Sequence, residues 1–236
     1  MPQFPIAPGH KIGEVVPLSV DDSKHLARIL RAAEGEEVTL FDGTHRLLGK
    51  IITVGKITTV RIVKPLPSPT LHGEVNLAQA LLKKDHMEFL VQKAVELGAA
   101  EFRPFRSERT IPTGENAIKI ERWQKIADEA LKQCGRIQPM RVWPVLGYAE
   151  LLVKFSGEVE KIIFSGEELP PPNPLLTKGG APIAFLIGPE GGFSEKEIQM
   201  AKENGYRSCS MGPLTLRAET AAIAALTLIQ HELGNL

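Results

Sequence analysis

The amino-acid sequence predicts an α/β protein in two parts, a small β-rich domain followed by a larger domain of alternating strands and helices. Three observations lead to this prediction. Short β-branched runs separated by turn signals fill residues 38–63. A proline-rich segment, KPLPSPT, follows at residues 64–70. From residue 74 onward, apolar strand-like runs alternate with amphipathic helical patterns, which is typical of α/β domains.

The composition is that of a globular protein with ordinary hydrophobic cores. The chain has 236 residues, of which 43% are hydrophobic and 24% charged, and its formal net charge is zero. This length suffices for one large or two ordinary domains. No apolar run approaches the roughly 18 to 20 residues that cross a bilayer, and the first residues lack a signal-peptide pattern. We therefore expect a soluble, cytoplasmic protein with no membrane partner.

Charged residues and cysteines narrow the expected partners. Lys and Arg outnumber Asp and Glu by 9 to 7 in residues 1–70 and by 12 to 9 in residues 81–141, whereas residues 142–236 contain 7 against 11. A surface that contacts phosphates is therefore expected in the first two segments. Cys134 and Cys209 have no CxxC or CxxH companion, so we expect two small buried residues and no metal site.

One helix and three strands are expected in the first domain, residues 1–70. In DDSKHLARILR, residues 21–31, the apolar side chains fall at helical spacing, and Asp21 or Asp22 can cap the helix start. The proline segment makes a stiff, extended connection, and the domain boundary is placed there. The predicted strands are Val38–Phe41, Lys50–Val54 and Ile57–Val63, with a turn at Asp42-Gly43 after the first.

The second domain, residues 71–236, begins with an apolar run at Val75–Leu82 and an amphipathic stretch at Asp85–Leu97 that stops at Gly98. A long helix is expected from Asn116 to Cys134, with Trp123 in the core. Further strands are predicted at Ile162–Phe164, Ile183–Ile187 and Ser208–Met211, and helices follow the last two.

The stretch APIAFLIGPEGGFSEKEI, residues 181–198, carries the first chemical signal. A buried strand leads into a glycine-rich turn, and Ser194 with Glu197 predicts a capping box at the start of the next helix. Glycines at 188, 191 and 192 permit a sharp turn and let a ligand approach the backbone. Such loops at the carboxyl ends of strands usually bind ligands in α/β domains. The pattern is neither GxGxxG nor a phosphate loop, which disfavours an ordinary dinucleotide or triphosphate.

The stretch SMGPLTLRAETAAIAALTLIQHEL, residues 210–233, repeats the order of glycine loop and helix. Its helix carries too broad an apolar stripe to lie singly on a wet surface, so a second subunit is expected against it. Arg217 and Glu219 flank the helix start. From the residues alone, a structural role is as good an interpretation as a functional one: Glu219 complements the helix dipole and Arg217 forms an ion pair.

Together, LIGPEGGFS and MGPLTLRAETAA resemble the SPOUT superfamily of trefoil-knotted methyltransferases, and in particular its ribosomal small-subunit methyltransferase E family. Further segments match in order along nearly the whole chain: HLARIL, FDG, FLVQKAVELG, SERT and RWQKIADEALKQCGR. One position departs from the family pattern, because Gln3 precedes Phe4 where an arginine is usual. The combination of segments is specific, whereas any single one is weak.

The resemblance implies a PUA-like β-barrel domain in front of a trefoil-knotted SPOUT domain, working as a homodimer. It implies methylation of N3 of a uridine in 16S rRNA of the small ribosomal subunit, with S-adenosyl-L-methionine as methyl donor. Arg217 and Glu219 are then the expected catalytic residues. Candidates for phosphate contacts are Arg28, Arg31, Arg109 and Arg136. The expected donor-binding residues are Ile187, Gly188, Glu190, Gly191, Gly192, Met211, Gly212 and Leu216.

Two other functions stay open at this point. The same fold could methylate another acceptor, either a ribose 2′-hydroxyl or a different RNA. The chain could also be a non-catalytic RNA-binding assembly factor that keeps a donor pocket, although the intact LRAET segment at residues 216–220 speaks against this. Likewise, each candidate arginine is also consistent with a solubilising surface group, and His25 with a packed or capping histidine.

Overall fold

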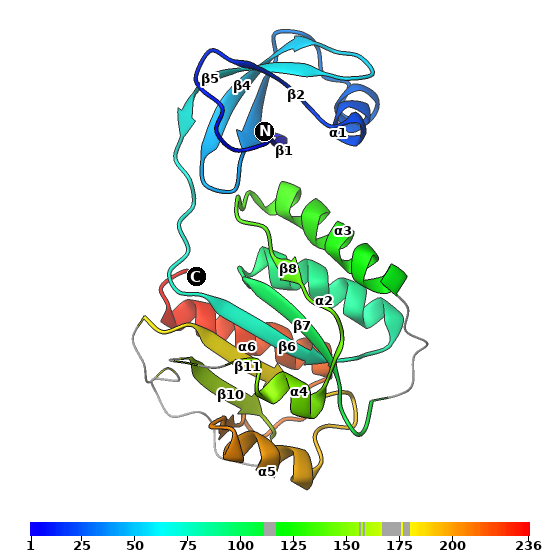
Figure 1. Cartoon of the computed structure of the whole chain (residues 1–236), viewed down its shortest axis with the longest axis vertical. Coiled ribbons are helices and arrows are strands. Elements are labelled where there is room, and N and C mark those ends of the chain that lie inside the picture. The colour runs from blue at the N-terminus through cyan, green and yellow to red at the C-terminus, as the bar shows by residue number, and fades with distance from the viewer. Residues whose placement is uncertain (111–116, 156, 158, 167–175, 177–179) are drawn as a thin grey trace. The chain divides into compact units, whose positions relative to one another are not determined.

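The computed structural model describes residues 1–110, 117–155, 157, 159–166, 176 and 180–236 (Figure 1). The chain forms two compact units. One comprises Met1–Thr70 with Leu131–Pro139, and the other comprises Leu71–Ala130 with Met140–Leu236. Among the helices of the described ranges, none is both long and apolar enough to cross a membrane.

The first unit is built on one five-stranded sheet. Its order is β1-β3-β4-β5-β2, and the edge strands β1 and β2 do not pair with each other. β1 lies parallel to β3, and every other pairing is antiparallel. The core of this sheet includes the fully buried Phe4, Leu26 and Leu40. The strands are β1 (Gln3–Pro5), β2 (Val15–Pro17), β3 (Glu37–Phe41), β4 (Arg46–Thr53) and β5 (Thr59–Leu66).

The three predicted strands of this unit correspond to β3, β4 and β5. The sequence misses β1 and β2, because three-residue strands are too short to show alternation. β5 extends into the proline segment that was expected to be a linker, since Pro65 stands opposite Leu47 in the register with β4. A proline removes one ladder donor, and the β4–β5 pairing is irregular nearby, between Leu48 and Gly49.

The helix of the first unit is short and changes type. α1 (Val20–Lys24) continues into a π-helical segment, His25–Ile29. Its cap is Ser19, whose Oγ accepts from the backbone N–H of Asp22 at 3.0 Å. The prediction that Asp21 or Asp22 caps the helix is therefore wrong. Just after the π-helical segment, Arg31 has a φ of 52°, the only positive φ of a non-glycine residue in the described ranges.

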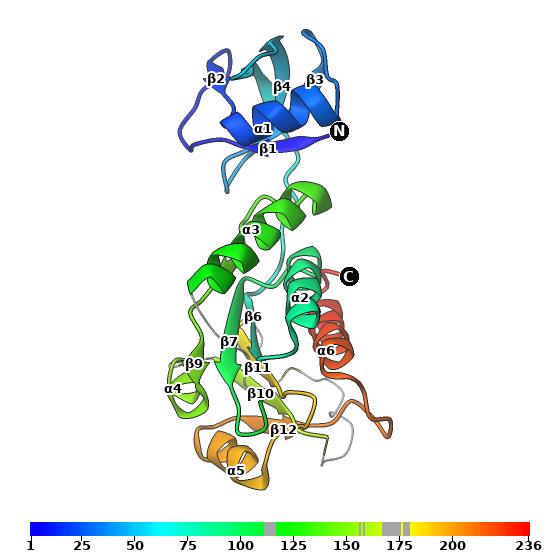
Figure 2. The ribbon, with the colours of Figure 1, turned by 90° about the vertical axis from the view of Figure 1, so that its right-hand side faces the viewer.

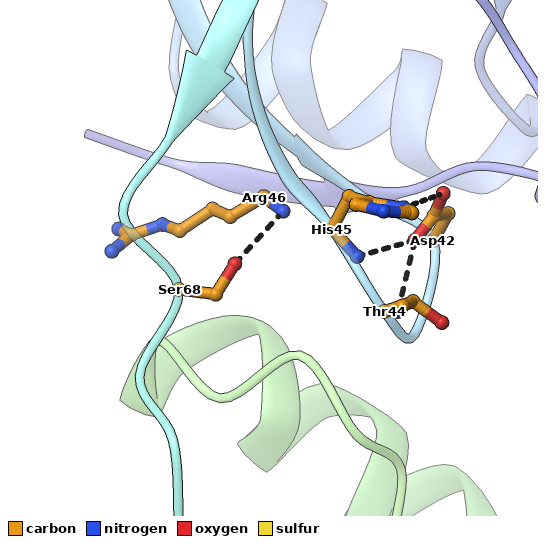
Figure 3. Close-up of polar contacts among 5 residues, drawn as sticks. All are labelled: Asp42, Thr44, His45, Arg46 and Ser68. Carbon is orange, nitrogen blue, oxygen red and sulfur yellow. Dashed lines mark hydrogen bonds and ion pairs between the residues drawn. The ribbon is translucent and has the colours of Figure 1, made fainter.

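The predicted turn after β3 is held by one carboxylate (Figure 3). Oδ1 of Asp42 accepts from the backbone N–H groups of Thr44 and His45, at 2.9 and 2.6 Å. Burial raises the pKa of Asp42, but these backbone hydrogen bonds and the His45 ring outweigh burial and leave the pKa below its usual value. Beside the turn, the backbone N–H of Arg46 donates to Ser68 Oγ at 3.1 Å.

Gln3, where the family usually has an arginine, lies buried within the first unit. Its Nε2 donates to the backbone carbonyls of Leu131 and Arg136, both at 2.9 Å. These carbonyls lie in and just after the last turn of α3 (Ala117–Cys134), where helix carbonyls lack partners of their own. Gln3 therefore caps a helix end in this protein.

The second unit contains a seven-stranded sheet in which every pairing is parallel. Its order is β12-β10-β11-β6-β7-β8, and β9 also pairs with β7. The strands are β6 (Val75–Ala80), β7 (Glu101–Arg106), β8 (Arg141–Val142), β9 (Leu146–Gly147), β10 (Glu160–Phe164), β11 (Ile183–Ile187) and β12 (Arg207–Cys209).

Helices cover both faces of this sheet (Figure 2). α2 (Lys84–Glu96) and α6 (Ala218–Glu232) contact each other, and α6 lies against β6 and β11. On the opposite face, α4 (Tyr148–Leu152) and α5 (Glu195–Glu203) enclose a core that includes Phe105, Leu186 and Phe193. Alternate strand residues point to opposite faces, so each strand of the sheet centre contributes to both cores.

Most predicted elements of this unit are confirmed. The strand at Ile183–Ile187 has the predicted bounds, and the helices after it and after β12 are present. Trp123 is buried, as predicted. β7, β8, β9 and α4 were not predicted from the sequence. β7 contains Pro104, which is unusual in a strand that pairs on both sides. The predicted helix start at Asn116 lies outside the described residues.

Of the two cysteines, Cys209 is buried as predicted, but Cys134 is exposed. The prediction for Cys134 is wrong because its place on the last turn of α3 turns its side chain to solvent, where its Sγ lies 3.7 Å from the Leu131 carbonyl.

Candidate active site

Both glycine loops leave the sheet of the second unit at the same level. β10 lies between β11 and β12 and is parallel to both. In the two registers, Phe164 is opposite Ile187 on one side and Cys209 on the other. Two strand spacings amount to about 10 Å, which is the scale of a nucleoside. The loop at 188–192 and the loop at 210–216 therefore start side by side at the carboxyl edge of the sheet, where α/β domains bind ligands.

The first loop is held by side chains from other parts of the unit. Gln79 on β6 is fully buried, and its Nε2 donates to the Gly188 carbonyl at 3.1 Å. Arg109, in the segment after β7, donates from a guanidinium nitrogen to the Gly191 carbonyl at 2.9 Å. The Glu190 carboxylate accepts from the backbone N–H of Lys83 at 3.4 Å. The loop is thus fixed from three sides before any ligand binds.

Glycine is needed in this loop for two different reasons. A Cβ at Gly188 would lie 3.2 Å from the Phe193 ring and 3.3 Å from the Gly192 carbonyl carbon, which is tighter than ordinary contact. Gly192 has a φ of +69°, a conformation that L-residues rarely adopt, and open space around its Cβ position. The first glycine is needed for close approach, and the second for backbone conformation.

The end of the first loop is anchored by a buried carboxylate. Ser194 and Glu197 form the predicted capping box at the start of α5. Glu197 also accepts from the Ser107 hydroxyl at 3.1 Å and from the backbone N–H of Glu108 at 2.9 Å. The SERT segment, residues 107–110, is therefore tied to the same helix start by hydrogen bonds to one carboxylate.

Three aromatic rings pack together at the end of the first loop. Phe193 stacks on Phe105 with centroids 6.3 Å apart, and Tyr148 contacts both rings. The Tyr148 hydroxyl donates to the Glu197 carbonyl at 2.7 Å, and burial raises the pKa of this phenol. The cluster fixes the turn between loop and helix.

The second loop has fewer contacts. Within the described residues, the side-chain hydrogen bonds of residues 210–216 join only Ser210 and Gly212. Met211, Gly212 and Leu216 are half-buried, and Leu214 is 78% exposed. The loop ends at Arg217, the N-cap residue of α6, whose side chain makes no cap hydrogen bond.

The charged residues at the start of α6 are not paired with each other. Arg217 is exposed, and no ion pair joins it to Glu219 in the part of the chain that the structure describes. Glu219 instead faces His86, near the start of α2, with 3.6 Å between the carboxylate Oε2 and the imidazole Nδ1. The described residues contain no cluster of His, Cys, Asp and Glu suited to a metal ion.

Two family models match this chain. The family described as RNA methyltransferase domain matches residues 69–230, and the family described as RNA methyltransferase PUA domain matches residues 18–60. A ribosomal RNA small subunit methyltransferase E of Buchnera aphidicola is 31% identical over 96% of this chain and 94% of its own length. The chain belongs to the ribosomal RNA small subunit methyltransferase E family.

Further proteins are similar to this chain over most of its length. The enzyme of that name from Bacillus subtilis is 29% identical over 90% of this chain and 88% of its own. The crystal structure of the Neisseria gonorrhoeae family member, bound to S-adenosyl methionine, is 32% identical, covers 98% of both chains and superposes with a TM-score of 0.92. A Legionella pneumophila methyltransferase, also in complex with this cofactor, gives 0.88 at 30% identity.

The candidate phosphate-binding residues of this family member fall in different settings. Arg28 lies within the π-helical segment and Arg31 lies just after it; both are exposed, as is Ile29, at 69%. Arg109 holds the first glycine loop through Gly191. Arg136 is 9% exposed, and burial lowers the pKa of its guanidinium group. His25 is exposed, so it is not a packed core residue.

Three residues of the site were missed in the sequence: Gln79, Lys83 and His86. Gln79 could have been identified from the sequence, because it is the one polar residue in the apolar stretch LAQALL. Lys83 acts through its backbone N–H, which no residue type reveals. His86 is recognisable only once α2 and α6 are placed against each other.

Proposed function

We propose that this protein transfers the methyl group of S-adenosyl-L-methionine to N3 of a uridine in 16S rRNA of the small ribosomal subunit. The observation that carries the proposal is the common level of the two glycine loops, with Ile187 and Cys209 both opposite Phe164. The family's methyltransferase names and the donor-bound relative from Neisseria gonorrhoeae support it.

The residues of the two loops suit a nucleoside with a charged sulfur. Gly192 and Gly212 have open space at their Cβ positions, so a ligand can approach the backbone there, and half-buried Met211 and Leu216 offer apolar surface. We assign the donor site to Ile187, Gly188, Glu190, Gly191, Gly192, Met211, Gly212 and Leu216. When bound, S-adenosyl-L-methionine supplies a methyl group on a sulfonium centre, which a nitrogen nucleophile attacks in line.

The chain's own contribution is to hold the acceptor and to favour loss of its N3 proton. Uracil loses this proton more readily when a donor stabilises the negative charge that spreads onto its carbonyl oxygens. We assign this role to Arg217, which is exposed at the start of α6. Glu219, two residues on, holds the arginine or accepts the proton. Fixing both reactants contributes up to about 7 to 11 kcal/mol in favourable cases.

RNA contacts are assigned to Arg28, Arg31, Arg109 and Arg136, with residues 1–70 as a PUA-like RNA-binding domain and residues 71–236 as the catalytic domain. The positive φ of Arg31 and the π-helical segment before it support this for the first two, because such irregular backbone often marks functional sites. The exposed Ile29 between them would add apolar contact to a base or sugar.

The remaining features belong to the same proposal. The catalytic domain is a SPOUT domain with a C-terminal trefoil knot, and the protein works in the cytoplasm, where its ribosomal acceptor lies. It is a homodimer, for which the half-exposed apolar side chains of Leu228 on α6 and Phe89 on the adjoining α2 provide a surface. Leu228→Glu is expected to shift the protein to a monomer in sedimentation velocity.

The deciding experiment uses small subunits that lack the modification. They are incubated with methyl-labelled S-adenosyl-L-methionine, and free 16S rRNA is treated in parallel. Digestion to nucleosides and mass spectrometry should then identify 3-methyluridine. Label on a ribose 2′-oxygen would establish the alternative acceptor, and no label with either substrate would leave a non-catalytic RNA-binding protein. Arg217→Ala serves as the control protein.

A further inference from the structure

A histidine and a carboxylate face each other across the two helices that cover one side of the sheet. His86 lies on the first turn of α2, and Glu219 lies on the first turn of α6. Nδ1 of the imidazole and Oε2 of the carboxylate are 3.6 Å apart. Both atoms are buried, and neither has a hydrogen-bond partner. The contact thus joins a buried nitrogen that can donate to a buried oxygen that accepts, but it is slightly too long for a hydrogen bond.

The other histidine–carboxylate contacts of the described residues are different. His10 with Glu14, and His45 with Asp42, are close neighbours in sequence and reach 3.2 and 3.1 Å. The pair of His86 and Glu219 instead joins two elements that are far apart in the chain. Buried polar atoms are nearly always paired, so two unpaired atoms facing each other indicate a contact that closes in another state. Catalytic hydrogen bonds are often long before substrate binds.

Only part of the His86 side chain is buried. The His86 side chain is 38% exposed although its Nδ1 is buried, so solvent reaches the other atoms of the side chain. Glu219 is 14% exposed and is the only carboxylate within ion-pair distance of His86 among the described residues. Lys83, Asp85 and Arg217 are charged neighbours in sequence, and no ion pair of theirs with either group is present there. His86 is therefore the partner available to the Glu219 carboxylate.

We propose that His86 is a positioning residue for methyl transfer: its Nδ1–H closes onto the Glu219 carboxylate when RNA is bound and fixes that carboxylate at the start of α6. This inference rests on the proposed function. Of the two roles proposed for Glu219, this contact favours proton acceptance, because a carboxylate held by α2 is directed away from Arg217 and does not hold the arginine. The guanidinium donors of Arg217 then remain available for the acceptor carbonyl, instead of being neutralised by the carboxylate two residues away.

A substitution series tests the role in catalysis. His86→Leu removes the donor, and turnover is expected to fall roughly 10- to 100-fold, because small misplacements of reacting groups have effects of this size. The KM for S-adenosyl-L-methionine should change less than about twofold, since the donor loops are untouched. His86→Lys restores a hydrogen-bond donor that can reach the carboxylate and should recover most of the turnover. The matched control is His231→Leu, at the far end of α6, which should behave as wild type.

A spectroscopic measurement tests the pair without relying on activity. The imidazole nitrogen and proton signals of His86 are identified by their absence in the His86→Lys spectrum. Glu219→Gln is expected to shift them, and more strongly in the presence of a target RNA fragment and S-adenosylhomocysteine. In kinetics, the double variant His86→Leu with Glu219→Gln should be no slower than the slower single variant, because the two residues act as one unit.

Failures of the two proposals are distinguishable. If wild-type protein methylates no RNA, the proposed function and this inference both fail. If wild-type protein is active while Glu219→Gln leaves the His86 signals unchanged, or His86→Lys is as slow as His86→Leu, this inference alone is overturned.

Discussion

The two glycine loops begin at the same level of the sheet, yet the rest of the molecule holds them very differently. Gln79, Lys83 and Arg109 all hydrogen-bond to the loop at 188–192, and a capping box closes its far end. The loop at 210–216 has one internal pair, Ser210 with Gly212, and presents Leu214 to solvent. The first loop is fixed before a ligand binds, whereas the second loop has few contacts that fix its conformation.

The difference assigns separate tasks to the loops. A site whose backbone is already fixed loses little conformational freedom on binding and therefore suits a donor that is the same in every turnover. A loop with few contacts can respond to a bulky acceptor, and it leads directly into Arg217. We expect substitutions around the first loop to weaken donor binding alone. Substitutions in the second loop, which contributes Met211, Gly212 and Leu216 to the proposed donor site and leads into Arg217, should also reduce turnover.

Arg217→Ala should reduce turnover by roughly 10²- to 10³-fold, which is the effect of removing one donor that stabilises developing negative charge. The affinity for S-adenosylhomocysteine, measured by calorimetric titration, should stay within about twofold, because the donor loops do not depend on this side chain. Equal losses of turnover and donor binding would contradict the assignment. Arg207→Ala is unsuitable as a control because Arg207 pairs with Glu160, so Lys196→Ala, at an exposed position on α5, is preferred.

Gln79→Leu should raise the dissociation constant of S-adenosylhomocysteine about tenfold while leaving turnover at saturating donor largely intact. It leaves the buried Gly188 carbonyl without its donor, at a cost of about 1 to 3 kcal/mol in folding free energy. Calorimetry measures the first effect, and urea unfolding measures the second. Gln199→Leu, an exposed position on α5, is the matched control. A variant that bound donor normally would show that the first loop does not need this brace.

Gly192→Ala tests whether the first loop's conformation matters beyond its general stability. The φ of +69° disfavours alanine by about 1 to 2 kcal/mol, and no neighbouring atom obstructs the added methyl group. Gly205→Ala, after α5, meets the same conditions with a φ of +82°. Both should lower the melting temperature similarly, but only Gly192→Ala should weaken donor binding, by up to about tenfold. If both variants lost donor affinity to the same extent, the effect would be due to reduced stability alone.

Leu214→Ser should have the smallest effect. Because this side chain is 78% exposed, the change in folding free energy should stay within about 0.5 kcal/mol. Thermal unfolding and donor titration are the checks. A clear drop in melting temperature would mean that the second loop is packed more firmly than its few contacts indicate.

Local signals predicted the local features of this protein. The strand at 183–187, the Ser194–Glu197 capping box and the turn at Asp42 all depend on residues within a few positions of each other, and all three are present. The cap of the first helix is an exception, because the adjacent Asp21 and Asp22 led to a prediction two or three residues past the actual cap, Ser19.

Features that depend on distant contacts were not predictable from the residues alone. Gln79 reaches the Gly188 carbonyl across 109 positions, and Gln3 reaches helix carbonyls across 128 and 133. β7 was missed because Pro104 argues against a central strand, although a parallel ladder can accommodate it. The burial of Arg136 and the exposure of Cys134 depend on how the end of α3 is fixed, which no local pattern records.

The strand order also governs how this protein must fold. β10 precedes both of its neighbours, β11 and β12, in the chain. β6 pairs with β11, and the paired residues Gln79 and Ile187 are 108 positions apart. Pairings of such long range carry a large loop-closure entropy and make folding slow. After dilution from urea, the helices should therefore recover first, and the capacity to bind a nucleoside should return last, with the closing of the sheet around β10.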